Sequence, residues 1–425
     1  MDAVLVTRAL GLHYLWVDAF CIIQDSEEDK AHEVKQIRHT FHNAYLTIIA
    51  ACANTVYDGF LHERSPPKSP STTLPFYCPD GILGTMHIRR GESAPANPID
   101  KCAWCLEEHL LSPRKLVYSS HTLQYVCQTM HINVNSASNF VSPENGISWL
   151  PFHIFLPKIP AGYNPPEDND TTWDAICTRY TRRTVTKAED RLNALAGIAE
   201  QFQHIWPESR YIAGLWEHHL PGCLLWENFG ESQCHQRPAQ NLAPSWSWAS
   251  TNGEVTTDFL LEYNEGILCS QDTIQVNVVA AHPMNPYGSV KHGFIGLEVI
   301  LKSALWHPGL GILLSNDIAY TALQEWIPSE QDKIGDVVPD TLETQSWKIC
   351  NVQLAVMRNT GYSLRGLVLV PATATAIGPN SSYTEDQFGD FPTFRRVGFF
   401  RARTVDKPEL AAQWLHSKQQ RIRII

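Results

Sequence analysis

The sequence predicts an α/β protein: an incomplete parallel sheet layer with helices, then a helical segment, then a β-rich C-terminal region. Three observations support this prediction. The first stretch of the chain alternates helix and strand patterns, as a parallel sheet covered by helices does. Residues 143–170 are rich in Pro, Gly and Asn, a composition typical of linkers. Beyond residue 251 the strand signals are short and separated by Gly, Asn and Pro. The predicted divisions are an α/β domain at 1–140, a linker at 141–170, a helical segment at 171–235 and the β-rich region at 236–425.

Composition excludes several function classes. A chain of 425 residues with 44% hydrophobic and 18% charged residues is an ordinary folded protein, too long for one core. The net charge of −11 argues against a nucleic-acid partner, because phosphate binding needs a cationic surface. The apolar run Tyr14–Ile23 is too short to span a bilayer and contains Asp18. Without a membrane segment or a signal peptide, we expect a cytoplasmic protein with reduced thiols.

The cysteines do not predict a metal site. Cys102 and Cys105 form a Cys-x-x-Cys pair, but no second pair follows it. Cys234 and His235 lie far away without regular spacing. Zinc sites need a repeated ligand spacing, so we expect no bound metal.

The first elements follow from apolar patterns. Asp2–Leu10 is predicted as a short helix that stops at Gly11. Leu12–Val17 is an apolar run that fits a buried parallel strand, with Asp18 at its C-terminal end. Ligand-contacting groups of open α/β sheets lie at such strand ends, so Asp18 is a candidate site residue. The alternative is that Asp18 is a turn or capping acid.

A second helix and strand follow. Ser26 and Asp29 resemble a capping box, and apolar residues then recur at three- and four-residue intervals, which predicts an amphipathic helix. Leu46–Ala50 is the next predicted strand, and the right-handed crossover rule places it beside Leu12–Val17 in one parallel layer. A loop with one hairpin near Met86–Arg89 precedes the next helix.

The helix that begins at Trp104 is the strongest candidate site. Ser112-Pro113 ends it, and strands are predicted at Lys115–Tyr118 and Leu123–Cys127. Trp104 and Glu108 stand at i and i+4, so an aromatic ring lies one turn from a carboxylate on the same face. A sugar or ring could pack on the indole while the carboxylate binds its hydroxyls. The alternative is a core tryptophan with a solvated acid, or an ion pair of Glu108 with Lys101 or Arg114.

The C-terminal half carries helices, paired tryptophans and strands. Helices are predicted at Trp173–Tyr180 and Glu189–His204. Trp246 and Trp248 alternate with serines, so we predict a strand with both indoles buried on one side. The later predictions are strands at Thr273–Val279, Gly296–Ile300, Leu367–Val370 and Arg396–Phe400, and a helix at Pro408–Ser417.

Several blocks of the sequence carry a resemblance in a consistent order. They are Tyr14–Gln24, Ala44–Ala51, Asp58–Leu61 and Ala103–Arg114, followed by Asp190–Ile198, Gly214–Trp216, Pro244–Ala249 and Arg396–Phe399. Together they resemble the fungal heterokaryon-incompatibility (HET) domain family and the region that follows the domain in many members. Two features depart from the family pattern. Its first strand has no counterpart, so we expect an N-terminally truncated or degenerate copy, and Cys102 stands where the family usually has Arg.

The resemblance implies a fold and a chemistry. HET domains are thought to be remotely similar to TIR domains, which implies a TIR-like or flavodoxin-like sheet layer. Some TIR domains cleave NAD with a glutamate in a Trp-Cys-Leu-x-Glu block, which Trp104-Cys-Leu-Glu-Glu108 fits. The resemblance therefore implies Glu108 as the catalytic residue, with Asp18, Gln24 and Trp104 binding the substrate.

The function that the resemblance implies is fungal nonself recognition leading to programmed cell death, with NAD as a possible substrate and no cofactor. The possible enzyme is an NAD nucleosidase, a hydrolase. The alternative is a non-catalytic signalling or interaction module, or a degenerate inactive copy. The expected partner is a protein from an incompatible strain, or a second copy of the chain.

Overall fold

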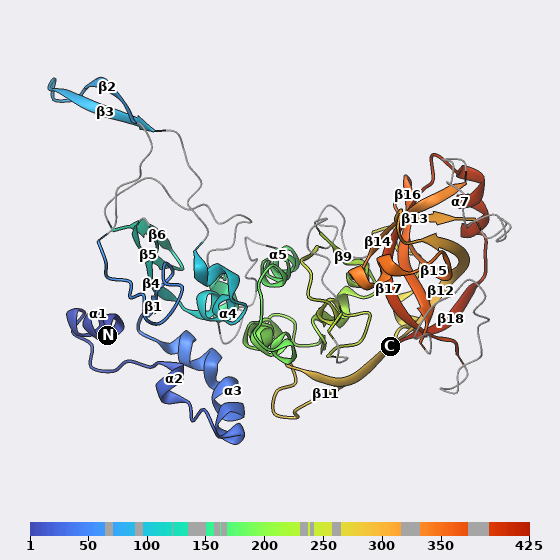
Figure 1. The fold of residues 1–425 in the computed structure, drawn as a ribbon, viewed down its shortest axis with the longest axis horizontal. Coiled ribbons are helices and arrows are strands. Elements are labelled where there is room, and N and C mark those ends of the chain that lie inside the picture. Colours follow the sequence, from blue (N-terminus) through green and yellow to red (C-terminus); the bar gives the residue numbers. More distant parts are fainter. Residues whose placement is uncertain are drawn as a thin grey trace. The chain divides into compact units, whose positions relative to one another are not determined.

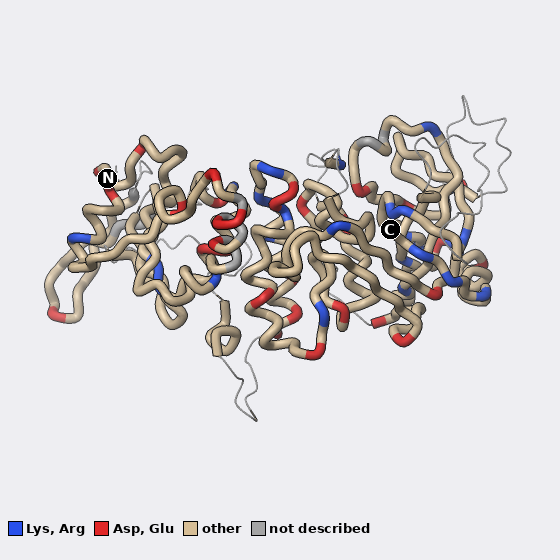
Figure 2. The backbone as a smooth tube through the Cα atoms, turned by 90° about the horizontal axis from the view of Figure 1, so that it is seen from below, with Lys and Arg blue, Asp and Glu red and all other residues tan. Residues whose placement is uncertain are grey.

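The computed structural model divides the chain into two compact units, Met1–Phe152 (unit 1) and His153–Ile425 (unit 2). Figure 1 shows their elements. The structure describes residues 1–63, 71–89, 97–120, 122–134, 150–156, 162, 168–229, 237–238, 242–256, 265–315, 332–372 and 391–425. Much of the predicted linker therefore lies outside the described residues. Acidic and basic residues are interspersed along both units (Figure 2), and no described helix has the length and apolar character needed to cross a membrane.

The helices of unit 1 comprise three that begin and end close to their predicted positions and two short ones that were not predicted. They are α1 (Asp2–Ala9), α2 (Asp18–Cys21), α3 (Glu27–Asn43), the 3-10 helix η1 (Pro98–Lys101) and α4 (Trp104–Leu111). The predicted cap of α3 is confirmed, because Ser26 Oγ accepts a hydrogen bond from Asp29 N at 3.2 Å. The Asp29 carboxylate in turn accepts from Ile23 N at 2.7 Å. Side chains at the helix start thus bind backbone N–H groups that have no partner within the helix.

A mixed sheet forms the centre of unit 1. Its strands are β1 (Thr47–Ile49), β4 (Arg114–Tyr118), β5 (Leu123–Cys127) and β6 (Met130–Asn133), in that order across the sheet. Only the pair β1–β4 is parallel, while β4–β5 and β5–β6 are antiparallel. The predicted hairpin is confirmed as β2 (Ser71–Tyr77) paired with β3 (Leu83–Arg89). The α/β character is confirmed, but the prediction of a parallel layer was wrong beyond the β1–β4 pair.

The predicted strand Leu12–Val17 was also wrong. This segment holds no strand, so it does not lie beside β1 in a sheet, and Asp18 begins α2 instead of ending a strand. Only Trp16 makes a ring contact, edge-on to Phe41 of α3 at 5.8 Å, and Tyr14 is 94% exposed. An apolar run becomes a strand only where a neighbouring strand supplies hydrogen bonds, and no described strand pairs with this one.

Unit 2 begins with helices that pack around aromatic side chains. α5 (Asn169–Thr181) is capped by Asp168, and α6 (Ala196–Gln203) follows two short 3-10 helices, η3 (Ala188–Asp190) and η4 (Asn193–Leu195). The predicted helix Glu189–His204 is therefore broken. Asn193 explains part of the break, because its side-chain oxygen accepts a hydrogen bond from Ser289 N at 3.0 Å. A long-range contact thus overrides the local helix preference.

Short elements join these helices to the β-rich region. They are η2 (Phe152–Phe155), β7 (Tyr211–Ile212), β8 (Leu215–Trp216), η5 (Glu217–His219), η6 (Gly222–Leu225), β9 (Glu227–Asn228), η7 (Trp248–Ser250), β10 (Val255–Thr256) and η8 (Gln271–Thr273).

The tryptophan prediction was half correct. Trp246 and Trp248 are buried, at 0% and 2% exposure. Their backbone, however, forms a turn and η7 in place of the predicted strand. Ser247 is the cause, because its hydroxyl accepts from Ala249 N at 3.0 Å and donates to the Ala213 carbonyl. Serine side chains that bind the backbone in this way compete with strand pairing.

The β-rich C-terminal region is confirmed. It is an eight-stranded sheet of β11 (Gln275–Ala280), β12 (Val290–His307), β13 (Ile312–Leu314), β14 (Lys333–Pro339), β15 (Cys350–Asn359), β16 (Ser363–Pro371), β17 (Thr393–Arg403) and β18 (Gln419–Ile424). The 3-10 helix η10 (Leu342–Ser346) and α7 (Pro408–Leu415) accompany these strands (Figure 1).

This sheet closes on itself. The strands run β12-β13-β14-β17-β16-β15, and β15 pairs back to β12. Closure leaves no free edge within the ring. Buried side chains of these strands form one hydrophobic cluster, which includes Trp306, Val352 and Phe400, and Trp414 of α7 packs edge-on against Phe400 at 6.4 Å.

A buried arginine of the ring binds both an acid of the same region and the preceding segment of unit 2. The Arg396 guanidinium is fully buried and binds both carboxylate oxygens of Asp340 at 3.1 Å. It also donates to the carbonyls of Leu224 and Trp226 at 2.6 and 2.5 Å, and lies 3.4 Å from the Trp226 ring centroid. Each nitrogen of the guanidinium therefore has an acceptor, and one face of the group lies on the Trp226 ring.

Candidate functional site

The helix α4 presents the candidate residues of unit 1. Leu106, Leu110 and Leu111 bury one face of α4 completely or nearly so. The helix ends at Ser112, whose hydroxyl donates to the Glu108 carbonyl at 2.7 Å. Trp104 and Glu108 are both partly buried. The apolar face thus anchors α4, and the Trp104–Glu108 spacing predicted from the sequence is a true helical turn.

The pKa of Glu108 is strongly perturbed. Burial raises its pKa from the ordinary 4.5 to about 8, and the charges of Asp18 and Cys102 add to the rise. Two like charges near each other disfavour ionisation of one of them. The structure therefore brings Asp18 into electrostatic range of Glu108, although the two stand far apart in the sequence.

Asp18 and Gln24 are joined through the backbone of α2. The exposed Asp18 carboxylate accepts from Ala19 N at 2.6 Å. Gln24 Nε2 donates to the carbonyls of Asp18 and Ile22 at 3.2 and 3.1 Å. Gln24 therefore holds the turn that carries Asp18. That Asp18, Gln24, Trp104 and Glu108 face one common cleft stays a prediction.

The raised pKa of Glu108 does not fit the alternative in which this side chain forms an ion pair. Arg114, one of the two candidate partners, donates to the Tyr45 carbonyl at 2.7 Å and lies over the Tyr45 ring. A neighbouring cation would lower the pKa of a carboxyl group, whereas that of Glu108 is raised. The environment of Glu108 is thus that of a buried carboxyl group with a raised pKa and not that of a surface salt bridge.

Comparison with known families gives one result. The family model described as Heterokaryon incompatibility protein (HET) matches residues 1–108. Unit 1 carries a HET domain. The matched segment contains Asp18, Gln24 and Trp104 and ends at Glu108. No curated protein and no solved structure matches the chain.

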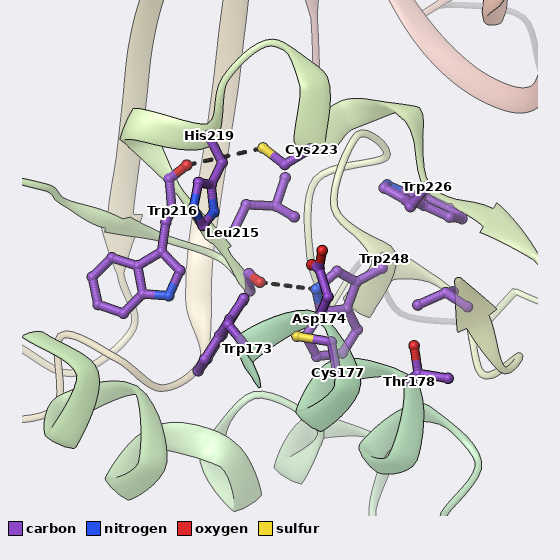
Figure 3. A pocket seen from close by; sticks show the side chains of 12 residues that line it. Trp173, Asp174, Cys177, Thr178, Leu215, Trp216, His219, Cys223, Trp226 and Trp248 are labelled. Atoms are coloured by element: carbon purple, nitrogen blue, oxygen red, sulfur yellow. Dashed lines mark hydrogen bonds between the residues drawn. The ribbon is translucent and has the colours of Figure 1, made fainter. Parts of the chain in front are cut away.

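Outside the HET domain, unit 2 holds a small cavity lined by aromatic side chains (Figure 3). Trp173, Trp216 and Trp248 surround it, and the Trp248 indole N–H donates to the Gly214 carbonyl at 2.9 Å. A Cβ on Gly214 would lie 2.7 Å from the Trp248 ring. The cavity volume of about 20 Å³ is enough for roughly one water molecule. This is a packed structural core and not a substrate pocket.

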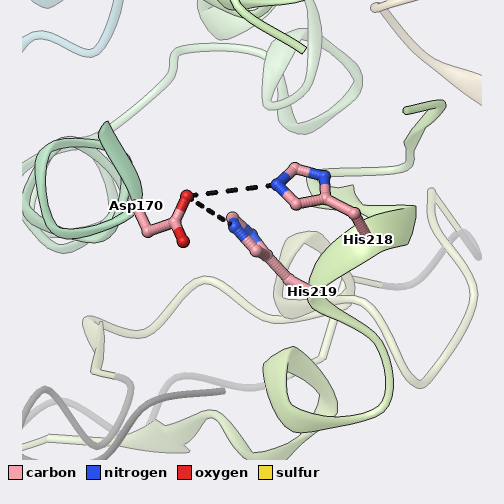
Figure 4. A group of neighbouring side chains, drawn as sticks. All are labelled: Asp170, His218 and His219. Atoms are coloured by element: carbon pink, nitrogen blue, oxygen red, sulfur yellow. Dashed lines mark ion pairs between the residues drawn. The ribbon is translucent and has the colours of Figure 1, made fainter. Parts of the chain in front are cut away.

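A second group, also outside the HET domain, combines two histidines with an acid. Asp170 in the first turn of α5 approaches His218 and His219 of η5 (Figure 4). Burial raises the pKa of Asp170, but its contacts with the two imidazoles outweigh burial and hold the pKa below its usual range. Burial lowers the pKa of His219, against the opposing effect of Asp170.

The sequence did not predict this group. Its only local signal is the adjacent pair His218-His219, and Asp170 lies too far along the chain to be linked to it by spacing. Of the cysteines considered from the sequence, Cys102 and Cys105 are partly buried and form no disulfide bond, and Cys234 lies outside the described residues.

Proposed function

We propose that this protein acts in nonself recognition and triggers cell death, and that its HET domain does so by cleaving NAD at the nicotinamide–ribose bond. The observation that carries this proposal is the proximity of Asp18 and Glu108, since the charge of Asp18 raises the pKa of Glu108. Both residues lie in the segment that matches the HET family, and paired acids create a negative potential suited to a cationic ligand.

NAD offers that cation. Its nicotinamide ring is positively charged, and bond cleavage moves positive charge onto the ribose. With a pKa of about 8, Glu108 is mostly protonated at pH 7 in the free protein. A cation bound beside it favours the carboxylate and lowers the pKa. The substrate would thereby produce the ionised form of Glu108 that stabilises an oxocarbenium-like ribose.

The reaction needs no metal, redox partner or strong acid. The bond between ribose C1′ and the nicotinamide nitrogen breaks, and its electron pair leaves with nicotinamide as a neutral ring. Water adds to C1′ and releases one proton, which gives ADP-ribose. Glu108 would bind the ribose hydroxyls, Trp104 would pack against the substrate, and Asp18, held by Gln24, would line the wall.

The test is nicotinamide release by the purified full chain, followed by killing and NAD depletion in a fungal host. Glu108→Gln keeps the size of the side chain but cannot ionise, so we expect at least a 100-fold loss of release and no killing. Glu28→Gln, an exposed acid on α3, is the matched control and should retain both. A Glu108→Gln variant that kills like the parent would show that catalysis by Glu108 is not the mechanism.

A non-catalytic interaction module is the second candidate, and the surface of unit 1 favours it. Tyr14 and Tyr57 are each 94% exposed, and Phe20 is 89% exposed. Exposed aromatic side chains are typical anchors of protein contacts. Under this alternative, Tyr14→Ser and Phe20→Ser abolish killing, whereas Glu108→Gln leaves it intact.

A further inference from the structure

The group formed by Asp170, His218 and His219 has the dimensions of a metal site. Asp170 Oδ1 lies 3.0 Å from His219 Nε2 and 4.0 Å from His218 Nε2. One potential ligand atom from each residue falls within 4.8 Å of the others. In Figure 4 both imidazoles point toward the carboxylate. The three side chains therefore converge on one point.

These distances match tetrahedral coordination. Zinc binds imidazole nitrogen and carboxylate oxygen at about 2.0–2.2 Å, so two ligand atoms of a tetrahedral site lie roughly 3.3 Å apart. The observed 3.0 and 4.0 Å bracket that value. Nitrogen ligands favour transition metals, whereas Ca²⁺ and Mg²⁺ prefer oxygen ligands.

Neighbouring side chains hold the imidazoles in a suitable orientation. His218 Nδ1 lies 2.6 Å from Ser209 Oγ. If Nδ1–H donates to this hydroxyl, the lone pair of Nε2 is directed at the metal, as in zinc sites where the second ring nitrogen is hydrogen-bonded. The Trp206 ring packs against both imidazoles, with centroids 4.7 and 5.3 Å away.

We propose that Asp170, His218 and His219 bind a divalent transition metal of the zinc class, with water in the remaining position. Three protein ligands and one open position are typical of catalytic zinc sites, while structural sites are closed by four. An open hollow of about 400 Å³ lies beside the site, lined by Trp206, Pro207, Glu208, Ser209, Glu217, His218 and Gln271. A small molecule held there would lie next to the metal.

This inference is independent of NAD cleavage, because all three ligands lie outside the HET match at residues 1–108. It is tested by equilibrium dialysis of the full, chelator-stripped chain against Zn²⁺, and by the visible absorption of Co²⁺ in place of Zn²⁺. We expect one metal ion per chain and the absorption of four-coordinate Co²⁺ with nitrogen and oxygen ligands. Uptake of no metal, or Co²⁺ absorption typical of thiolate ligands alone, would overturn the proposal.

Substitutions of single residues test whether the metal binds at these three side chains. Asp170→Asn and His219→Gln should each weaken Zn²⁺ binding at least 100-fold, and Ser209→Ala by roughly 10–100-fold. His282→Gln, an exposed histidine of the same unit, should bind like the parent. Because the Asp170 side chain is 44% exposed, Asp170→Asn should remain folded, as its unfolding temperature in the presence of chelator would show. Unchanged affinity in Asp170→Asn contradicts the site even if His219→Gln proves unstable.

Discussion

The two units of this chain differ in how much of their apolar surface they bury. In unit 2 one buried cluster extends across the closed ring of strands and α7. Among the described residues of unit 1, smaller clusters lie around Ile49 and Val117 and around Val6 and Tyr118, and the leucines of α4 are also buried. The unit with the thinner core is the one that matches the HET family and exposes Tyr14, Phe20 and Tyr57. The candidate NAD site and the buried cluster of the closed ring therefore lie in different units.

The largest predicted effect comes from the buried ion pair of unit 2. Arg396→Leu leaves Asp340 buried without its main partner, and breaking such a pair costs about 3–5 kcal/mol. Calorimetry of the full chain should show this loss in the transition assigned to unit 2. Arg403→Leu is the control, because Arg403 forms an exposed pair with Asp406 worth about 0–1 kcal/mol. Equal effects of the two variants would mean that the Arg396 network is not important for stability.

Removing a buried aromatic side chain from unit 2 should destabilise the protein far more than removing an exposed one from unit 1. Trp248→Ala removes a buried indole and its hydrogen bond to Gly214, and should cost about 3–5 kcal/mol. Tyr14→Ala, at a residue that is 94% exposed, should change the free energy of unfolding by less than about 0.5 kcal/mol. Chemical denaturation followed by circular dichroism measures both. A large loss from Tyr14→Ala would show that unit 1 buries this ring in solution.

The pKa of Glu108 makes the stability of unit 1 depend on pH. The folded state holds the proton up to about pH 8, whereas the unfolded chain releases it near 4.5. Folding is therefore favoured by this proton at low pH, and stability should fall by roughly 3–4 kcal/mol as pH rises from 5 to 8. Glu108→Gln should flatten this dependence. Identical pH profiles for the two proteins would contradict the raised pKa.

The smallest predicted effect concerns the start of α3. Ser26→Ala removes the hydroxyl that binds Asp29 N and should cost about 1 kcal/mol, while Ser26→Gly should cost only a few tenths. Thermal unfolding of unit 1 reports the difference. A loss of several kcal/mol would mean that unit 1 depends on α3 more than its small core clusters suggest.

Elements with local signals could be predicted from the sequence. The cap at Ser26, the helix α4 ending at Ser112-Pro113 and strands such as β16 and β17 all follow from residues close together in the chain. The prediction for Leu12–Val17 failed because strand formation depends on a distant partner that the pattern does not reveal. The same limit explains the broken helix at Asn193, whose side chain binds Ser289.

The candidate sites depend on contacts between distant parts of the chain even more than the helices and strands do. Spacing alone paired Trp104 with Glu108 on one helix face, and the structure keeps that arrangement. The raised pKa of Glu108 comes from burial and from Asp18, neither of which is visible in a helical repeat. The Asp170–His218–His219 group could not be predicted, because the fold brings its acid and its histidines together from separate segments.

The closed ring of unit 2 has a consequence for the order in which the chain folds. β12 must pair with β15, and its first half also pairs with β18, where Ile295 faces Ile424. Such non-local pairings form slowly, because the entropy cost of closing a long loop comes before any stabilising contact is made. On a ribosome, the pairing of β12 with β18 would wait until the last strand of this sequence had emerged. During that interval the part of β12 that pairs with β18 would be exposed to chaperones, while the elements of the HET domain, made earlier, could already pair.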